Sequence, residues 1–137
     1  MSKPSLEAAF RATTYRVETS EGPFDLRIGR NDPAFDHFLH GQGVCRWGIL
    51  TACNPGALHL SAEENQCRQE QLLMRLRALG CLFFAGCNVA DQGDWPPEAS
   101  CLILQLGEDE LRTLARAFSQ LAVVCGDTGS PPRLLWV

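Results

Sequence analysis

The sequence predicts an α+β fold with a ferredoxin-like split βαβ core, an antiparallel sheet with two helices on one face. The first reason is the predicted order of elements from Trp47 to Cys125: strand, helix, strand, strand, helix, strand. The second is that each of the two long helices has a single apolar face, as expected for a helix that covers a sheet. At 137 residues, the chain is expected to form one domain over residues 1–137.

The first third of the chain adds short elements to this core. They are a helix over 5–11, a hairpin with strands over 13–19 and 24–28, and a short helix with Phe35, Phe38 and Leu39 on its apolar face. Asp32 followed by Pro33 is typical of a helix start, with Asp as the N-cap and Pro in the first turn. The hairpin and a last strand at the C-terminus are expected to extend or flank the core sheet.

Capping residues and turns define the core elements. Ser61 and Glu64 have the spacing of a capping box, and Gly80 is suited to end the helix that they begin. The predicted core elements are strand Trp47–Cys53, helix Ala62–Leu79, strands Cys81–Val89 and Ala99–Leu106, helix Glu108–Ser119, and strands Ala122–Cys125 and Arg133–Val137.

One polar residue stands on the apolar face of the first long helix. That face contains Leu72, Leu73, Leu76 and Leu79, and four-residue steps back along it lead through Gln69 to Asn65. Helical side chains lean toward the helix N-terminus, so Asn65 is expected to point inward and to hydrogen-bond the Thr51–Gly56 segment.

Charge and composition narrow the function classes. The net charge is −4, and Lys3 is the single lysine, which argues against a nucleic-acid partner because phosphate binding needs clustered basic side chains. No apolar run reaches the length of a membrane span, and the first residues lack the apolar core of a secretion signal. We therefore expect a cytoplasmic protein that does not bind membranes.

The seven cysteines are irregularly spaced and form no C-x-x-C pair. Most stand in apolar segments, so we expect free and mostly buried thiols. The histidines show no metal-ligand spacing, and the chain contains no phosphate-binding or dinucleotide-binding glycine motif. We therefore expect neither a metal site nor a cofactor.

A family resemblance runs from about Ala9 to the C-terminus. It rests on four segments: Thr51-Ala52-Cys53-Asn54-Pro55, the Ser61/Glu64/Asn65 helix start, Gly93-Asp94-Trp95-Pro96-Pro97-Glu98-Ala99-Ser100, and Phe118-Ser119-Gln120. Together they resemble the bacterial family called domain of unknown function 3293. That family commonly has Gly where this chain has Ser119 and Asn where it has Leu121. The resemblance implies a small cytosolic bacterial protein and supplies no established activity.

The candidate site lies at the end of the first core strand. A tight turn after this strand and a capped helix start bring backbone N–H groups and small polar side chains to one place. The candidate ligand-binding residues are Thr51, Asn54, Asn65, Trp95, Glu98 and Gln120. From these residues we expect a module that binds a small polar or anionic molecule, and a homodimer through a sheet edge or face is compatible with the sequence.

Other interpretations of the same residues stay open. The asparagines also suit a purely structural role, in which they satisfy the backbone of the turn. A small hydrolase or transferase would use Glu98 as a general base, or Cys53 as a nucleophile with His59 as its base. A third interpretation is a protein-interaction domain without a small-molecule site. A concave pocket between the Asn54 turn and the Trp95 loop, with Glu98 facing Asn65, would favour the first two functions, and a filled, flat surface would favour the third.

Overall fold

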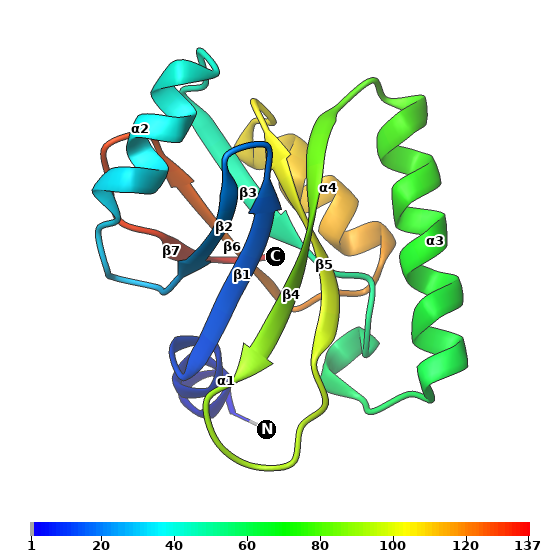
Figure 1. The fold of residues 1–137 in the computed structure, drawn as a ribbon. Helices are drawn as coiled ribbons and strands as arrows, with labels where there is room; N and C mark the ends of the chain where they lie inside the picture. The colour runs from blue at the N-terminus through cyan, green and yellow to red at the C-terminus, as the bar shows by residue number, and fades with distance from the viewer. Residues whose placement is uncertain (1) are drawn as a thin grey trace.

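Residues 2–137 are described in a computed structural model, and they form an α+β fold around one curled antiparallel sheet (Figure 1). The strands are β1 (Thr13–Thr19), β2 (Gly22–Leu26), β3 (Arg46–Leu50), β4 (Leu82–Ala90), β5 (Glu98–Leu104), β6 (Ala122–Asp127) and β7 (Arg133–Trp136). The α-helices are α1 (Lys3–Arg11), α2 (Pro33–Gly41), α3 (Ala62–Ala78) and α4 (Glu108–Ala117), and η1 (Pro55–Ala57) is a short 3₁₀ turn.

The sheet has the strand order β2-β1-β4-β5-β3-β6-β7, and every neighbouring pair is antiparallel. The N-terminal hairpin extends the sheet beside β4, and β7 extends it beside β6, as expected from the sequence. The sheet curls until a hydrogen bond links the segments next to its two edge strands: the Gly29 N–H donates to the Pro132 carbonyl at 2.8 Å.

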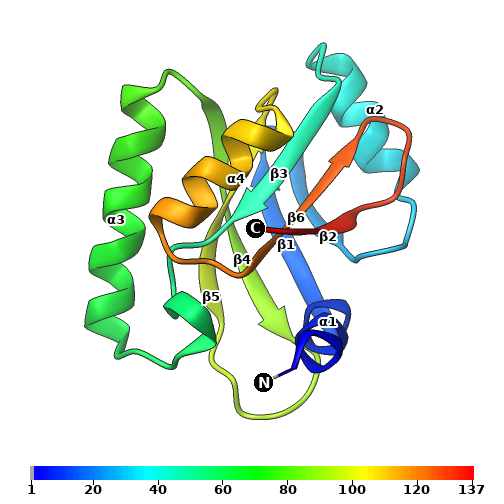
Figure 2. The ribbon, with the colours of Figure 1, turned by 180° about the vertical axis from the view of Figure 1, so that it is seen from behind.

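Helices α3 and α4 pack on the same face of the sheet (Figure 2). Leu72 and Leu76 of α3 share one apolar core with Leu111 and Leu114 of α4. A Cβ at Gly48 of β3 would lie 2.6 Å from a methyl group of Leu111, so glycine at this position allows α4 to approach the sheet closely. The expectation that both long helices cover one face is met by this shared core.

The opposite face of the sheet holds a second core, covered by α2 (Figure 1). Phe35 and Phe38 of α2 pack with Trp47 of β3, and the Phe35 and Trp47 rings meet edge to face with centroids 5.3 Å apart. Asp32 caps α2 as expected: its carboxylate accepts the Phe35 N–H at 3.0 Å, and Pro33 fills the first helical position.

Several sequence expectations differ from the structure, among them bounds of α1, β2, β5 and β6 that differ by about two residues. Strand β3 ends at Leu50 rather than Cys53, because the polar groups of Ala52 bond to side chains of α3 instead of a neighbouring strand. Leu79 is 57% exposed, because it follows α3 as the C-cap and points away from the sheet. Of the seven free cysteines, three are buried, two are half-buried and two are exposed, so fewer are buried than expected.

Candidate functional site

The candidate site lies where β3 ends, beside the start of α3 and the β4–β5 loop, which Figure 1 shows at the same end of the sheet. Ser61 caps α3 by accepting the Glu64 N–H at 3.1 Å, and the Glu64 carboxylate accepts the Ser61 N–H at 3.4 Å. This is the capping box that the sequence predicts. It fixes the first turn of α3 and thereby the direction in which Asn65 points.

Asn54 and Asn65 bond to each other through both backbone and side chain. The Asn54 N–H donates to Asn65 Oδ1 and Asn65 Nδ2 donates to Asn54 Oδ1, each at 2.8 Å. Asn54 Oδ1 also accepts the Leu60 N–H at 2.9 Å, which closes the 54–60 loop on itself. The predicted contact between Asn65 and the Thr51–Gly56 segment is therefore present, and Asn54 is buried with 4% exposure.

Glu98 joins this pair from β5. Asn54 Nδ2 donates to Glu98 Oε2 at 2.6 Å, and the same oxygen accepts Trp95 Nε1 at 3.2 Å. The Trp95 side chain is 43% exposed, and its ring lies against that of His59 with centroids 5.2 Å apart. The β4–β5 loop is thus tied to the 54–60 loop through one carboxylate.

Thr51 and Gln120 both hydrogen-bond to the backbone of Cys53, at the start of the turn. Thr51 Oγ1 donates to the Ala99 carbonyl at 2.7 Å and accepts the Cys53 N–H at 3.0 Å. Gln120 Nε2, from the segment after α4, donates to the Cys53 carbonyl at 3.0 Å. The structure therefore brings all six candidate residues into one connected set, called here the Asn54 network: Thr51, Asn54, Asn65, Trp95, Glu98 and Gln120.

Two supporting residues of α3 were not among the candidates. Gln69 Oε1 accepts the Ala52 N–H at 3.0 Å, whereas Arg68 donates to the carbonyls of Ala52 at 2.7 Å and Phe118 at 2.5 Å. The place of Gln69 on the apolar face of the helix was a sequence indication of its role. Arg68 gave none, because its partners are backbone carbonyls of segments far away in the sequence.

The backbone around the Asn54 network is strained. Among residues 2–137, four non-glycine residues have left-handed φ, and three of them are Asn54 (φ 49°), Ala57 (φ 62°) and Ser119 (φ 56°). The Gly56 N–H donates to the Ser119 carbonyl at 2.8 Å, so the two strained segments touch. For Ala57 such a conformation costs about 1–2 kcal/mol, whereas asparagine adopts it more readily. At Ser119 it belongs to the cap that ends α4, in which the Gln120 N–H donates to the Ala115 carbonyl at 2.9 Å.

A cleft of about 660 Å³ opens beside this network, between the 53–61 loop, the first half of α3 and the segment that enters β5. Asn65, Gln69 and Cys53 line it together with apolar side chains. This volume is within the range of small-molecule sites. The predicted concave pocket is therefore present, with Pro96 and Pro97 of the Trp95 loop in its wall. Glu98 is outside the lining and accepts a hydrogen bond from Asn54, so the expected pairing of Glu98 with Asn65 across the pocket is not formed.

The thiol of Cys53 faces the same cleft but is poorly suited to attack a substrate. Burial raises its pKa, which lowers the fraction of thiolate. Its Sγ lies 3.7 Å from the Ala99 carbonyl oxygen, to which it donates, whereas the His59 ring packs on Trp95. A nucleophile with an adjacent base, the arrangement that this chemistry requires, is not formed by these two residues.

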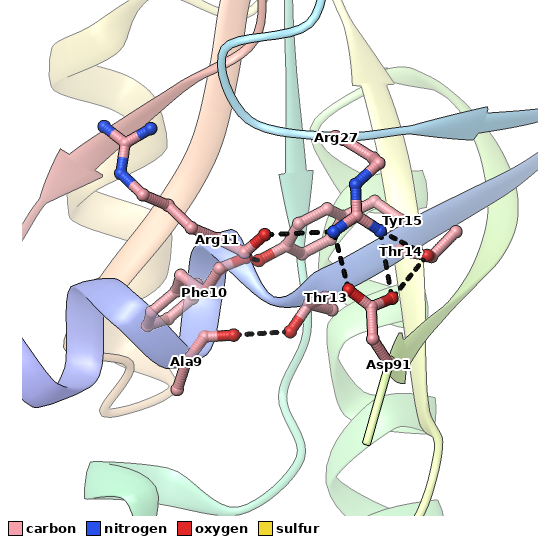
Figure 3. A network of polar contacts seen from close by, with 8 residues as sticks. All are labelled: Ala9, Phe10, Arg11, Thr13, Thr14, Tyr15, Arg27 and Asp91. Carbon is pink, nitrogen blue, oxygen red and sulfur yellow. Dashed lines mark hydrogen bonds and ion pairs between the residues drawn. The ribbon is translucent and has the colours of Figure 1, made fainter.

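A second polar network lies at α1 and the first hairpin (Figure 3). Arg27 pairs with Asp91 through Nη2 and Oδ2 at 2.6 Å, and Thr14 Oγ1 donates to Asp91 Oδ1 at 2.9 Å. Tyr15 donates its hydroxyl to the Phe10 carbonyl at 2.8 Å, and burial raises the pKa of Tyr15. This Arg27 network joins α1, the hairpin and the β4–β5 loop.

A second cleft, of about 500 Å³, lies at the start of α4. Its wall contains charged side chains, of which Arg133 and Glu108 already form an ion pair with each other. Arg133 also donates to Cys125 Sγ at 2.9 Å. Arg46, Glu110 and Asp127 also line this cleft, so its wall is more strongly charged than that of the cleft beside the Asn54 network.

Fold and site together define an α+β protein with a small-molecule-sized cleft and no recognisable catalytic triad or dyad among residues 2–137. A family model described as "Protein of unknown function (DUF3293)" matches residues 50–123, more than half of the chain, and the chain belongs to this family. The matched segment contains all six residues of the Asn54 network. The comparison with curated proteins found no match, and neither did the comparison with solved structures.

Among residues 2–137, none of the helices combines the length and the apolar character needed to cross a membrane.

Proposed function

We propose that this protein binds a small molecule in the cleft beside the Asn54 network, and that the network holds the 54–60 loop in the conformation that shapes the cleft. The observation that carries the proposal is the coincidence of strain and cavity. Asn54 and Ala57 have left-handed φ in the 53–61 loop, and Cys53, His59, Leu60 and Ser61 of this loop line the cleft. A loop that only connected β3 to α3 would have no need of this strain.

The network supports the cleft rather than contacting a ligand with all its members. Asn65 lines the cleft, whereas Asn54 and Glu98 stand behind it and are bonded to protein groups. Thr51 and Gln120 hold backbone groups of the turn. In this proposal Asn65 and Trp95 are the members of the network nearest to a ligand, and the others are positioning residues.

A binding module is favoured over a hydrolase or transferase by the state of Cys53. Its buried thiol has a raised pKa and donates to a backbone carbonyl. Glu98 accepts two hydrogen bonds on one oxygen from Asn54 and Trp95, which is the role of an anchoring acceptor. Neither residue has the partner set of a nucleophile or general base.

A protein-interaction domain is the second candidate, and one observation favours it. Leu58 is 66% exposed and Trp95 is 43% exposed, and each is adjacent in sequence to a residue that lines the cleft, His59 or Pro96. Exposed apolar side chains of this size are more typical of a contact surface than of bare solvent-facing loops. A partner protein seated there would bury both residues and cover the cleft.

The fold also supports a finer assignment. Strands β4-β5-β3-β6 lie side by side in that order, and α3 and α4 share one core on the same face. We propose that these elements form a ferredoxin-like unit that the hairpin and β7 extend. The cytoplasmic location, the bacterial origin, the homodimer and the absence of a nucleic-acid partner stay predictions of the sequence.

A thermal-shift screen against a metabolite library tests the proposed function, with three versions of the protein. Ala62→Trp places an indole in the cleft, because Ala62 is an exposed lining residue in the first turn of α3. Glu63→Trp adds the same ring one position along, outside the lining, and is the matched control. We expect compounds that raise the melting temperature of the wild type and of Glu63→Trp but not of Ala62→Trp.

Two outcomes would contradict the proposal. One is a complete screen without a stabilising compound. The other is a set of compounds that stabilise the wild type and both tryptophan variants alike, because such compounds would bind elsewhere on the protein.

A further inference from the structure

The wall of the cleft beside the Asn54 network is mainly apolar. Its apolar side chains come from three separate segments: Leu60 and Ala62 at the start of α3, Leu73 further along α3, and Pro96, Pro97 and Ala99 at the start of β5. A ligand that fills this cleft must therefore have an apolar body, since burying polar groups against these walls without hydrogen bonds is unfavourable.

Most polar side chains in the wall are already bonded within the protein. Ser61 Oγ accepts the Glu64 N–H, Gln69 Oε1 accepts the Ala52 N–H, and both side-chain atoms of Asn65 bond to Asn54. The wall thus has few free N–H groups with which to bind a carboxylate or phosphate. The capping box also occupies two of the backbone donors at the start of α3, which lowers the capacity of this helix end to hold an anion.

The titratable side chains in the lining of the cleft are Cys53, His59 and Glu70, and the His59 ring packs against Trp95. The carboxylate of Glu70 is the acidic group of this cleft. Glu70 lines it, and its Oε1 accepts Gln66 Nε2 at 3.3 Å, whereas no ion pair involves Glu70 among residues 2–137. Glu63 and Glu64 stand on the first turn of α3 and offset the positive end of its dipole. The nearby cation, Arg68, is outside the lining and donates to two backbone carbonyls.

From this combination we infer that the cleft binds a ligand with an apolar body and a positively charged amine, and that the amine lies at the carboxylate of Glu70. The inference rests on the proposed function, because it names the class of ligand for the same cleft. It departs from the small polar or anionic molecule that the sequence predicts, since the carboxylate of Glu70 disfavours an anion. Glu70 acts here as a specificity residue, and the apolar walls provide the surface against which the body of the ligand is buried.

Three probes that share one apolar body and differ in charge test this inference: 2-phenylethylamine, 2-phenylethanol and phenylacetate. Their affinities are measured by NMR titration of the wild-type protein at pH 7. We expect the amine to bind best and phenylacetate to bind worst. Since Glu70 is exposed, its contribution is that of a surface ion pair, about a two- to five-fold change in affinity.

The variant Glu70→Gln is expected to remove the advantage of the amine over the alcohol and to leave the affinity of the alcohol unchanged. Glu63→Gln makes the same change of net charge outside the lining and is expected to keep the advantage. Added salt should weaken binding of the amine to the wild type and have little effect on the alcohol.

The two hypotheses fail in different ways. Equal affinities for the amine and the alcohol, tighter binding of phenylacetate, or an unchanged preference in Glu70→Gln would overturn the inference and leave the cleft as a binding site. Absence of binding by all three probes, together with a metabolite screen without hits, would overturn the proposed function and the inference with it.

Discussion

The Asn54 network and the Arg27 network both join distant segments with side-chain hydrogen bonds, but they are built from different groups. The Arg27 network is centred on an ion pair whose two side chains are 26% and 31% exposed. The Asn54 network is centred on two amides, and Asn54 is buried. Moreover, the second is flanked by left-handed residues and a cleft, whereas the first joins elements of regular backbone.

The family match separates the two networks further. Residues 50–123 include every member of the Asn54 network, whereas Arg27 and Thr14 lie before the matched segment. The Arg27 network links the hairpin, α1 and the β4–β5 loop through side-chain hydrogen bonds and one ion pair. The Asn54 network lies wholly within the matched segment, which also contains Asp91 of the Arg27 network.

The largest effect is expected for Asn54→Ala. This change removes the acceptor of the Leu60 N–H, the partner of Asn65 and the donor to Glu98, and it places alanine at a left-handed φ. We expect a loss of about 3 kcal/mol in the free energy of unfolding. Denaturant melts provide the measurement.

Asn54→Gly is the matched control for this prediction, since glycine adopts the same φ without strain. It should be about 1 kcal/mol more stable than Asn54→Ala while still less stable than the wild type. If both variants unfolded at the denaturant concentration of the wild type, the network would contribute nothing to stability.

Asn65→Leu is expected to cost about 2 kcal/mol, although leucine adds apolar surface. The reason is that the Asn54 N–H loses its acceptor and Asn54 Oδ1 loses one of its two donors. Asn65→Asp keeps the acceptor and loses the donor, so its effect should be smaller but still destabilising. Gln66→Leu, at the exposed neighbouring position, is the control and should melt like the wild type.

We expect Asp91→Asn, which disrupts the Arg27 network, to destabilise the fold less than Asn54→Ala or Asn65→Leu. The effect should appear in only part of the pH range. Hydrogen bonds from Arg27 and then from Thr14 hold the pKa of Asp91 down at about 2. An unfolded chain takes up this proton near pH 4. The stabilisation is therefore complete above about pH 4 and is lost as the pH falls from about 4 to about 2.

Denaturant midpoints of the wild type and Asp91→Asn between pH 2 and pH 7 test this dependence. The two curves should lie apart at pH 5–7 and converge toward pH 2. Curves separated by the same amount at every pH would mean that ionisation of Asp91 is unimportant to the fold.

The smallest effect is expected for Ser119→Gly, which should stabilise the fold by about 0.5 kcal/mol. Relief of the left-handed strain at φ 56° slightly exceeds the extra entropy that glycine gives the unfolded chain. Ser130→Gly, at an exposed loop position outside the left-handed region, is the control and should be slightly destabilising. The explanation would be contradicted if Ser130→Gly had a higher melting temperature than Ser119→Gly.

Much of the site was predictable because its residues obey local rules. The capping box at Ser61 and Glu64 sets where α3 begins, and helical periodicity then places Asn65 and Gln69 on the face toward the sheet. The contact of Asn65 with the turn follows from these two facts. The predicted end of β3 was wrong by three residues, because the partners of Ala52 are side chains of α3 rather than a strand.

The sequence by itself determined the order of the helices and strands, the caps that begin α2 and α3, and which residue of α3 turns inward, because these depend on neighbours within a few positions. Most element boundaries differ from the prediction by one to three residues. Only the tertiary structure decided that Glu98 and Trp95 meet Asn54, that Arg68 binds two distant carbonyls, and that a cleft remains beside them. Those contacts join residues dozens of positions apart, and their geometry depends on how the sheet curls and how closely α3 and α4 pack on it.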